Sequence, residues 1–243
     1  MNAEFESMSA LHAIAPAFVP KPHAWGSYLS LEDTHFFLCD FHDMTDGLPD
    51  KAQFTANLAA LHLGSASPDG KFGFHITTYM GPLPQDNTWT DTWEEFYKRG
   101  MRRMLDLEAE AQGPCEELEG LAVPLFEKVI PRLLRPLETN GNSIKPVLIH
   151  GDLWYGNCLT DSATNNPIIF DACSFWAHNE CSCFPLHLIA PFERSWLTNL
   201  DEIGTWRALR YRFGKEYIKA YHNHIPISPP EEDHDDRNAL YAM

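Results

Sequence analysis

The segment His150-Gly151-Asp152-Leu153-Trp154-Tyr155-Gly156-Asn157, followed by Asp171, has the residue types and spacing of a phosphoryl-transfer site. Such a transfer needs an aligned hydroxyl, metal ions that neutralise phosphate charge, and a carboxylate that accepts the hydroxyl proton. Asp152 is the candidate base, and Asn157 offers a neutral oxygen to magnesium. The H-G-D-x-x-x-x-N pattern with a later Asp is far more restrictive than a bare H-x-D tripeptide.

Short apolar segments around the motif predict how its residues meet. Residues 146–149 form an apolar run that enters His150, and residues 157–160 and 167–170 predict two hairpin arms. A hairpin returns the chain to its own open end, so we expect Asp171 to meet Asn157 and to share a Mg²⁺ ion with it. The alternative is that Asp152 and Asn157 only cap local backbone groups, which accounts for each residue singly but not for their joint placement.

The first 48 residues predict a very small lobe that ends in a linker. The spacing of Phe5, Met8 and Leu11 is that of a helix. Residues 23–29 and 35–39 predict two short strands joined by a polar turn. We expect a helix and a hairpin in this lobe, with some apolar sheet surface exposed.

Residues 49–243 predict a larger, mainly helical lobe. A helix is expected from residue 51, with Gly64 just past its C-terminal end. Thr92 begins a capping box that predicts a long amphipathic helix to about Gln112. A further helical segment at 115–137 should be interrupted by Pro124 and Pro131.

The C-terminal part predicts one more helix and a tail. A helical stretch is expected from after Asp201 to about His224. Residues 229–236 combine two prolines with a run of acidic residues, which predicts a solvated acidic loop.

The composition indicates a folded protein that does not bind nucleic acid. Hydrophobic residues make up 44% and aromatic residues 12% of the chain, as in globular domains. The 18 Lys and Arg residues face 34 Asp and Glu residues, and the resulting net charge of -16 repels a phosphate backbone. The acidic surface is compatible with a cationic substrate, but a role in solubility is the favoured interpretation.

The sequence also predicts a cytoplasmic location. Residues 1–6 lack a basic segment followed by an apolar run, and no stretch approaches the roughly 18 apolar residues of a membrane span. We therefore expect no membrane partner. The six cysteines are scattered along the chain, which favours reduced thiols over a disulfide framework.

The motif, with Leu-Trp after His-Gly-Asp and Ile-Phe-Asp closing the hairpin, resembles the fructosamine kinase and ketosamine 3-kinase family, which belongs with the aminoglycoside-phosphotransferase-like kinases. The likeness spans nearly the whole chain. Other stretches that resemble the family are Glu4-Phe5-Glu6-Ser7-Met8, His35-Phe36-Phe37-Leu38-Cys39-Asp40-Phe41, Lys71-Phe72-Gly73-Phe74, Asn87-Thr88-Trp89, Trp93-Glu94-Glu95-Phe96-Tyr97 and Tyr217-Ile218-Lys219-Ala220-Tyr221-His222.

The resemblance implies an α+β, protein-kinase-like two-lobed fold that uses ATP and Mg²⁺. It implies phosphorylation of the sugar 3-hydroxyl of a ketosamine (ribulosamine or fructosamine) on a protein lysine or a free amine, which makes the adduct unstable and repairs glycation. By position, Asp152 corresponds to the catalytic base, and Asn157 and Asp171 correspond to the metal ligands. The partner is then a glycated protein or a small-molecule ketosamine.

The resemblance also implies roles in nucleotide and substrate binding. Asp40 and Phe41 fall in the hinge that meets adenine, through backbone hydrogen bonds. Glu4 falls where the first helix supplies a carboxylate to the ATP-binding lysine. Trp154 corresponds to a residue beside the sugar pocket, and plain packing is its alternative role.

One part of the family pattern is missing. The family has a glycine-rich loop and a lysine-bearing strand ahead of the first helix, whereas this sequence begins at that helix and has no G-x-G-x-x-G or G-x-x-x-x-G-K-[ST] motif. Lys21 lies in a turn-like Pro-Lys-Pro context and is no substitute. We therefore expect a truncated N-terminal lobe. The alternatives to an active enzyme are a catalytically silent kinase fragment or pseudokinase, or another small-molecule kinase of the aminoglycoside or choline type.

Three rival interpretations remain open. A zinc site is one alternative, although its spacing is not a common ligand pattern; its residues would be His178, Cys181, Cys183 and His187. A serine hydrolase built on Ser174 or Ser182 lacks a G-x-S-x-G elbow. The aromatic residues Trp89, Trp93 and Phe96 could form a ligand platform, and the alternative is that they are helix core.

Overall fold

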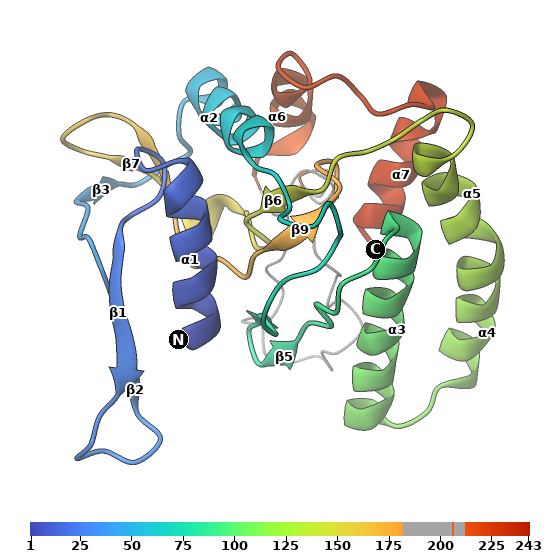
Figure 1. Cartoon of the computed structure of the whole chain (residues 1–243), viewed down its shortest axis with the longest axis horizontal. Coiled ribbons are helices and arrows are strands. Elements are labelled where there is room, and N and C mark those ends of the chain that lie inside the picture. Colours follow the sequence, from blue (N-terminus) through green and yellow to red (C-terminus); the bar gives the residue numbers. More distant parts are fainter. Residues whose placement is uncertain (182–205, 207–211) are drawn as a thin grey trace.

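The computed structural model describes residues 1–181, 206 and 212–243. Within these residues, small antiparallel sheets and helices of mixed α/β type surround a common hydrophobic core. Figure 1 shows a hairpin and one helix at the left, short strands at the centre, and a group of helices at the right.

The N-terminal helix and hairpin form as the sequence predicts. Helix α1 (Asn2–Ile14) buries Ser7, Met8 and Leu11 on one face. Strand β1 (Pro22–Ser27) pairs antiparallel with β2 (His35–Cys39) in a two-stranded sheet. The ring of Phe37 on β2 meets that of Phe5 on α1 edge-on at 6.3 Å, which fixes the hairpin against the helix.

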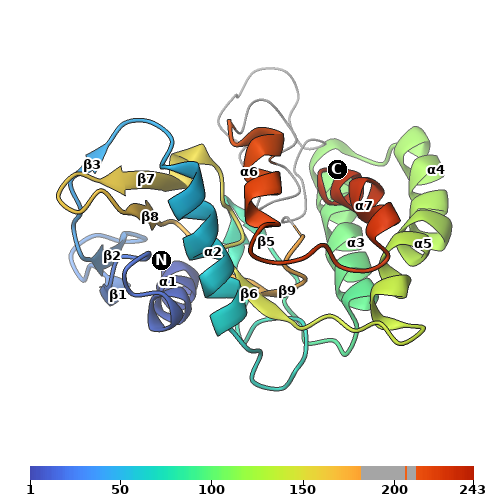
Figure 2. The ribbon, with the colours of Figure 1, turned by 90° about the horizontal axis from the view of Figure 1, so that it is seen from above.

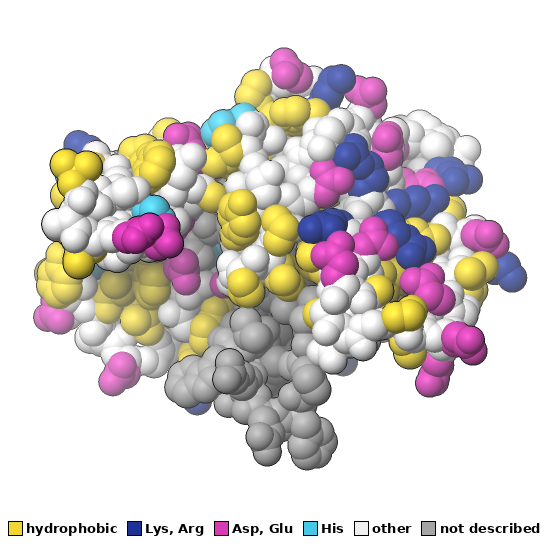
Figure 3. Space-filling view, turned by 90° about the horizontal axis from the view of Figure 1, so that it is seen from below, with side chains coloured by type: hydrophobic (Ala, Val, Ile, Leu, Met, Phe, Trp, Pro, Cys, Tyr) yellow, Lys and Arg dark blue, Asp and Glu magenta, His cyan; other side chains and the backbone are white. Residues whose placement is uncertain are grey.

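The hairpin exposes apolar side chains, which confirms the expected apolar sheet surface. They include Trp25, Tyr28, Leu29, Leu31 and Leu38. Hydrophobic side chains gather at the left of the space-filling view in Figure 3. The opposite end of the same view differs, because basic and acidic side chains intermingle there. Arg99 and Asp86 form one of the ion pairs of the molecule, at 2.9 Å.

Helix α2 (Lys51–Gly64) begins at Asp50, whose side chain accepts a hydrogen bond from the N–H of Gln53. The prediction that Gly64 lies just past the helix end was wrong by one residue, because Gly64 is its last helical residue. Ser65 closes the helix instead, since its hydroxyl and its backbone N–H both donate to the carbonyl of His62.

Helix α3 (Trp93–Gln112) confirms the predicted cap and length. The hydroxyl of Thr92 accepts a hydrogen bond from the N–H of Glu95. Trp93 is 0% and Phe96 1% exposed, so these aromatic residues are helix core and not a ligand platform.

The segment after α3 is helical with the predicted interruptions. Helix α4 (Glu116–Pro124) runs into a π-helical turn, η1 (Leu125–Val129), followed by α5 (Ile130–Leu134) and a 3₁₀ turn, η2 (Arg135–Glu138). The π turn begins directly after Pro124, which has no N–H to continue the helical hydrogen-bond ladder.

The central strands carry the candidate site. Strand β6 (Val147–Ile149) pairs antiparallel with β9 (Phe175–Ala177), and all six residues are buried. Strands β7 (Cys158–Asp161) and β8 (Pro167–Ile169) form the predicted hairpin, which β3 (Met44–Thr45) extends in the order β3-β7-β8. A small hairpin of β4 (Tyr79–Met80) and β5 (Leu83–Pro84) lies beside them.

The C-terminal tail contains a helix where a solvated loop is predicted. A 3₁₀ turn, η6 (Glu231–Asp233), leads into α7 (His234–Tyr241), which buries Arg237, Leu240 and Tyr241. The loop prediction was wrong because contacts with distant residues, which the local composition does not reveal, hold this acidic segment as a helix.

The preceding helix, α6 (Gly214–Tyr221), is the described part of the stretch predicted to reach His224. Residues 201–205 and 207–211 of that stretch lie outside the described residues. Figure 2 shows α6 beside α2, and the aromatic residues Tyr217 and Phe54 make one of the contacts between them. No helix among the described residues is both long enough and apolar enough to cross a membrane.

Candidate active site

His150 follows β6 and organises the loop after it. Its Nε2 donates to the carbonyl of Phe170 at 2.9 Å, and its Nδ1 accepts from the N–H of Asp152 at 3.2 Å. A neutral imidazole has one donor and one acceptor nitrogen, so these two partners assign the proton to Nε2. The buried ring thus links the start of the loop to the end of the β7–β8 hairpin.

Gly151 is required by the local backbone. Its φ is +91°, and a Cβ at this position would lie 2.4 Å from the carbonyl oxygen of Cys173. The N–H of Cys173 in turn donates to the carbonyl of His150 at 3.0 Å. The loop therefore lies directly against residues 172–174, and a side chain at position 151 would separate the two segments.

Asp152 and Asn157 are joined within the loop. The side-chain amide nitrogen of Asn157 donates to the backbone carbonyl and to the Oδ2 of Asp152, each at 2.9 Å. These two bonds use both amide hydrogens and leave the amide oxygen for another partner. Among the described residues, the Oδ1 of Asp152 is buried and accepts no hydrogen bond. A buried carboxylate oxygen without a donor is suited to accept a proton from a bound hydroxyl.

Asp171 stands at the open end of the hairpin, as the sequence predicts. It follows β8, has a left-handed backbone with φ 61°, and is exposed. The N–H of the preceding residue, Phe170, donates to the carbonyl of Asn157 at 3.1 Å and ties the two ends of the hairpin together.

Three carboxylates share this region. Burial and the nearby charge of Asp171 raise the pKa of Asp152 well above its ordinary value, against the hydrogen bond from Asn157, which lowers it. Burial and the same Asp171 charge also raise the pKa of Glu4, which the N-terminal ammonium lowers. The charge of Asp171 thus acts on both Asp152 and Glu4, which places Glu4 near the candidate base and metal ligands.

The donor set fits a hard cation. The amide oxygen of Asn157 and the exposed carboxylate of Asp171 are oxygen ligands of the type Mg²⁺ prefers, and Mg²⁺ commonly takes its remaining ligands from phosphates and water. A bound cation would also offset the repulsion between Asp152 and Asp171. The described residues include no group of three or more His, Cys, Asp or Glu that could hold a metal by themselves.

Helix α1 is fixed to this site by a contact that the sequence analysis missed. The N–H of Ser174 donates to the hydroxyl of Ser7 at 3.0 Å, and both residues are 0% exposed. The sequence contained one signal of this contact, a serine next to Met8 on the predicted buried face of α1. A buried hydroxyl needs a hydrogen-bond partner. The bond sets the position of the first turn of α1, which carries Glu4.

Asp40 and Phe41 directly follow β2 at the end of the hairpin. The carboxylate of Asp40 bonds His23 Nε2 at 2.6 Å, and this hydrogen bond lowers the pKa of Asp40. Its backbone N–H donates to the carbonyl of Lys21, and the ring of Phe41 is 90% exposed. Burial raises the pKa of Cys39, and the charges of Glu4 and Asp40 raise it further. Cys39 therefore lies near both of these carboxylates.

Trp154 folds back over its own loop. A Cβ on Gly156 would lie 2.4 Å from the indole ring, and the ring meets that of Tyr155 edge-on at 4.7 Å. The indole is half-buried, so one part of it packs on the loop and another part is exposed to solvent. Trp154 lies two residues after Asp152 in the sequence. Its assignment to a sugar pocket stays a prediction.

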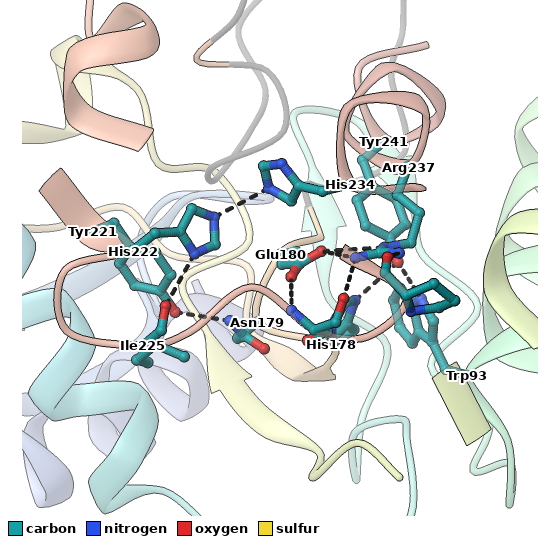
Figure 4. A network of polar contacts seen from close by, with 12 residues as sticks. Trp93, His178, Asn179, Glu180, Tyr221, His222, Ile225, His234, Arg237 and Tyr241 are labelled. Carbon is teal, nitrogen blue, oxygen red and sulfur yellow. Dashed lines mark hydrogen bonds and ion pairs between the residues drawn. The ribbon is translucent and has the colours of Figure 1, made fainter. Parts of the chain in front are cut away.

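The residues of the rival zinc site belong to a different region. Both ring nitrogens of His178 are hydrogen-bonded, to the hydroxyls of Tyr241 and Ser228, as Figure 4 shows for Tyr241. Burial lowers the pKa of His178 to about 4. Cys181 is buried, whereas Cys183 and His187 lie outside the described residues, as does Ser182 of the hydrolase alternative.

Comparison with known proteins relates this geometry to sugar-amine kinases. The family described as fructosamine kinase matches residues 1–208. The chloroplastic protein-ribulosamine 3-kinase of Arabidopsis thaliana is 27% identical over 249 residues, which cover 100% of this chain and 64% of that protein. The ketosamine-3-kinase of Mus musculus is 35% identical over 174 residues, which cover 71% of this chain and 46% of that protein.

Solved structures agree in fold. A crystal structure described as a fructosamine-3-kinase from Thermobifida fusca YX-ER1 is similar with a TM-score of 0.68 at 25% identity, over 99% of this chain and 70% of that chain. A second, from Haemophilus somnus 129PT, has a TM-score of 0.65 at 18% identity over 98% and 70% of the two chains, and supports the fold alone. The chain spans less than two thirds of the length of the Arabidopsis and mouse relatives.

Proposed function

Because the chain belongs to the fructosamine kinase family, we propose that it carries the phosphoryl-transfer site of an ATP-dependent ketosamine 3-kinase. The observation that carries this proposal is the joint placement of three groups. A base candidate, an amide oxygen and an exposed carboxylate lie around the open end of one hairpin, on Asp152, Asn157 and Asp171. One buried oxygen of the base candidate accepts no hydrogen bond from the described residues.

The three groups divide the chemistry between them. Asp152 accepts the proton of the attacking sugar hydroxyl, and its raised pKa makes it a stronger base than an exposed aspartate. Asn157 and Asp171 hold Mg²⁺, which neutralises charge on the transferring phosphate of ATP. Asn157 has a second role, because its hydrogen bonds to Asp152 hold the carboxylate in position.

The substrate in this proposal is a ribulosamine or fructosamine on a protein lysine or a free amine. The substrate amine is cationic, and the site it approaches contains the carboxylates of Glu4, Asp152 and Asp171 on a chain of net charge -16. Trp154 would flank the sugar ring. In the same proposal Glu4, Asp40 and Phe41 belong to the nucleotide side of the site.

We also propose the two-lobed arrangement for this chain, with a partial N-terminal lobe at 1–48 and a catalytic lobe at 49–243. We further propose a cytoplasmic location. The pairing of β1 and β2 into a two-stranded sheet is consistent with a reduced first lobe. A catalytically silent kinase fragment is the second candidate function. It is favoured by the clustered carboxylates of Glu4, Asp152 and Asp171, because their charges repel the phosphates of ATP until a cation binds.

The deciding experiment incubates the purified chain with radiolabelled ATP, Mg²⁺ and a ribulosyl- or fructosyl-lysine peptide. We expect phosphate on the sugar 3-hydroxyl, located by NMR, and a loss of roughly 100-fold or more on Asp152→Asn. The matched control is Asp106→Asn, which changes an exposed aspartate on α3 and should leave the rate unchanged.

A folded chain that transfers no phosphate to either ketosamine would reject the active-enzyme proposal. Binding of ATP and Mg²⁺ without transfer, measured by calorimetry, would instead support the silent kinase fragment. Full activity of Asp152→Asn would remove Asp152 as the base.

A further inference from the structure

A cavity between α6 and α7 is lined by several basic side chains that the phosphoryl-transfer site does not use. Its volume is about 370 Å³, within the range of small-ligand pockets. Lys215 and Lys219 line it from one face of α6, at positions i and i+4, and His222 lines it from the residue that ends this helix. His234 lines it from the start of α7. The lining shares no residue with the loop that contains Asp152.

The two lysines of the cavity have no carboxylate partner among the described residues. Many of the chain's other basic side chains pair with carboxylates, such as Lys51 with Glu216 and Lys98 with Glu94. Within the described residues, by contrast, neither Lys215 nor Lys219 has a carboxylate within 4.0 Å. Two cations one helical turn apart repel each other, and a bound anion would remove that repulsion.

The two histidines meet across the cavity. Their Nε2 atoms lie 3.1 Å apart, and the Nδ1 of His222 bonds the carbonyl of Ile225 at 3.0 Å. Figure 4 shows the two rings facing each other, with His222 also directed to Ile225. Since a carbonyl accepts only from N–H, the Nε2 of His222 is the lone-pair acceptor and the Nε2 of His234 is the donor.

That hydrogen bond exists only while the pair has a single Nε2 proton. A second proton would place two N–H groups against each other, unless an oxyanion lay between them and accepted from both. The apolar part of the lining, Ile218 and Ile227, limits hydration of the cavity and strengthens such charge-assisted bonds.

We propose that this cavity is a binding site for a doubly charged tetrahedral oxyanion, of the kind found in phosphate monoesters, held by Lys215, Lys219, His222 and His234. Up to four cationic groups surround the cavity, with Asp235 as an acidic member of its lining. The site goes beyond the proposed kinase function and does not depend on it. A transition metal on the histidine pair is disfavoured by the two adjacent lysines, which would repel it.

The site should bind its anion together with a proton. Burial lowers the pKa of His234, and the charges of His222 and Arg237 lower it further, whereas Glu180 and Asp235 raise it. Lys215 and Lys219 face the cavity from α6 and also disfavour a second imidazolium. A bound anion favours protonation of both histidines, because its negative charge stabilises the two imidazolium groups.

Sulfate is the first probe, because its charge does not change over the pH range in which histidine titrates. Isothermal titration calorimetry in buffers of different ionisation enthalpy should show saturable binding, with proton uptake of up to about one proton per sulfate near pH 7. Binding should strengthen toward about pH 5.5. Methyl phosphate should compete with sulfate, and acetate should compete only weakly.

Two sets of variants test the residues. Lys215→Gln with Lys219→Gln should weaken sulfate binding roughly tenfold or more, whereas the matched pair Lys128→Gln with Lys145→Gln, which changes two exposed lysines elsewhere, should not. His234→Asn should abolish the proton uptake, and His224→Asn, an exposed histidine outside the lining, should preserve it.

Three outcomes would overturn the proposal. They are the absence of saturable binding, equal weakening by both lysine pairs, and stoichiometric zinc binding that releases protons and blocks sulfate. Because all four lysines are exposed, the lysine variants should fold, which a thermal melt verifies, so the lysine comparison decides even if His234→Asn does not fold.

Discussion

Asn157 donates its side-chain amide twice to Asp152, once to the backbone carbonyl and once to Oδ2, at 2.9 Å each. The other carboxylate oxygen of Asp152 is buried, and none of the described residues donates to it. The loop therefore positions a carboxylate without fully stabilising its charge. A buried carboxylate whose charge is only partly stabilised costs folding stability.

The first prediction is that Asp152→Asn stabilises the fold at neutral pH. Burial and Asp171 raise the pKa of Asp152, so folding is favoured while the group is protonated, and this contribution is lost as the pH rises through the folded pKa. The amide cannot ionise and avoids that loss. Thermal melts should show a higher Tm for the variant near pH 7 and a difference that disappears below about pH 4, the ordinary pKa region of aspartate.

Asp106→Asn is the control for this measurement, because Asp106 is exposed on α3. Its Tm difference from the native chain should be small at every pH. A lower Tm for Asp152→Asn at neutral pH would show that the native carboxylate is stabilised, and would contradict the origin that we assign to its raised pKa.

The second prediction concerns the glycine of the loop. Gly151→Ala should destabilise the fold by several kcal/mol, because the left-handed backbone costs about 1 kcal/mol and the new Cβ would lie 2.4 Å from the carbonyl oxygen of Cys173. Gly141→Ala is the matched control, since Gly141 has φ +88° but no atom within 4 Å of its Cβ position. Urea unfolding should separate the two variants, and equal losses would mean that the loop relaxes away from Cys173.

The placement of the loop after β6 and of the hairpin that follows it could be predicted from the sequence, because the residues that determine it are close together in the chain. The spacing from His150 to Asn157 and the hairpin that returns to Asp171 lie within 22 consecutive residues of the sequence. The start of α3 could be predicted for the same reason, since Thr92 caps a backbone N–H only three residues away. In such cases the residues that interact are also neighbours in the chain.

Contacts between distant residues could not be predicted in this way. The bond between Ser7 and Ser174 joins residues 167 positions apart, and nothing near either serine identifies its partner. The acidic tail was predicted as a loop because its charge pattern indicates solvation. Its helix α7 depends on an ion pair between Arg237 and Glu180, which lie 57 positions apart.

The third prediction tests the turn of the β7–β8 hairpin. Hydrogen bonds lower the pKa of Asp161 to about 2. The bond from His42 has the largest effect, and the bonds from Thr164 add to it. A lowered pKa means that the ionised group stabilises the fold above the unfolded pKa, near 4, and that this contribution is lost as the pH falls toward 2. Asp161→Asn keeps an oxygen acceptor but removes the charge, so its Tm should be lower at about pH 6 and should approach the native Tm near pH 2.

Asp46→Asn is the control for the hairpin, because Asp46 is exposed and lies next to β3, which pairs with β7. It should leave Tm unchanged across the same pH range. An Asp161→Asn variant with a native Tm at about pH 6 would show that the turn does not need the charge of Asp161.

The fourth prediction concerns the buried ion pair that holds α7. Arg237 donates to Glu180 Oε2 through Nε at 3.2 Å and through Nη2 at 3.1 Å, and the two side chains are 0% and 2% exposed. Figure 4 shows the pair beside Tyr241. Arg237→Met should destabilise the fold by about 3–5 kcal/mol, because it leaves the Glu180 carboxylate buried without its cation. Urea unfolding measures the loss.

Two further variants separate the ion pair from simple loss of packing. Adding Glu180→Gln to Arg237→Met should recover part of the stability, because the uncompensated charge is then removed. Arg132→Met breaks a more exposed pair with Asp233, at 2.9 Å, and should cost less than about 1 kcal/mol. If the double variant is no more stable than Arg237→Met, the loss comes from the bonds that Arg237 also donates to the carbonyls of Ser228 and Pro230.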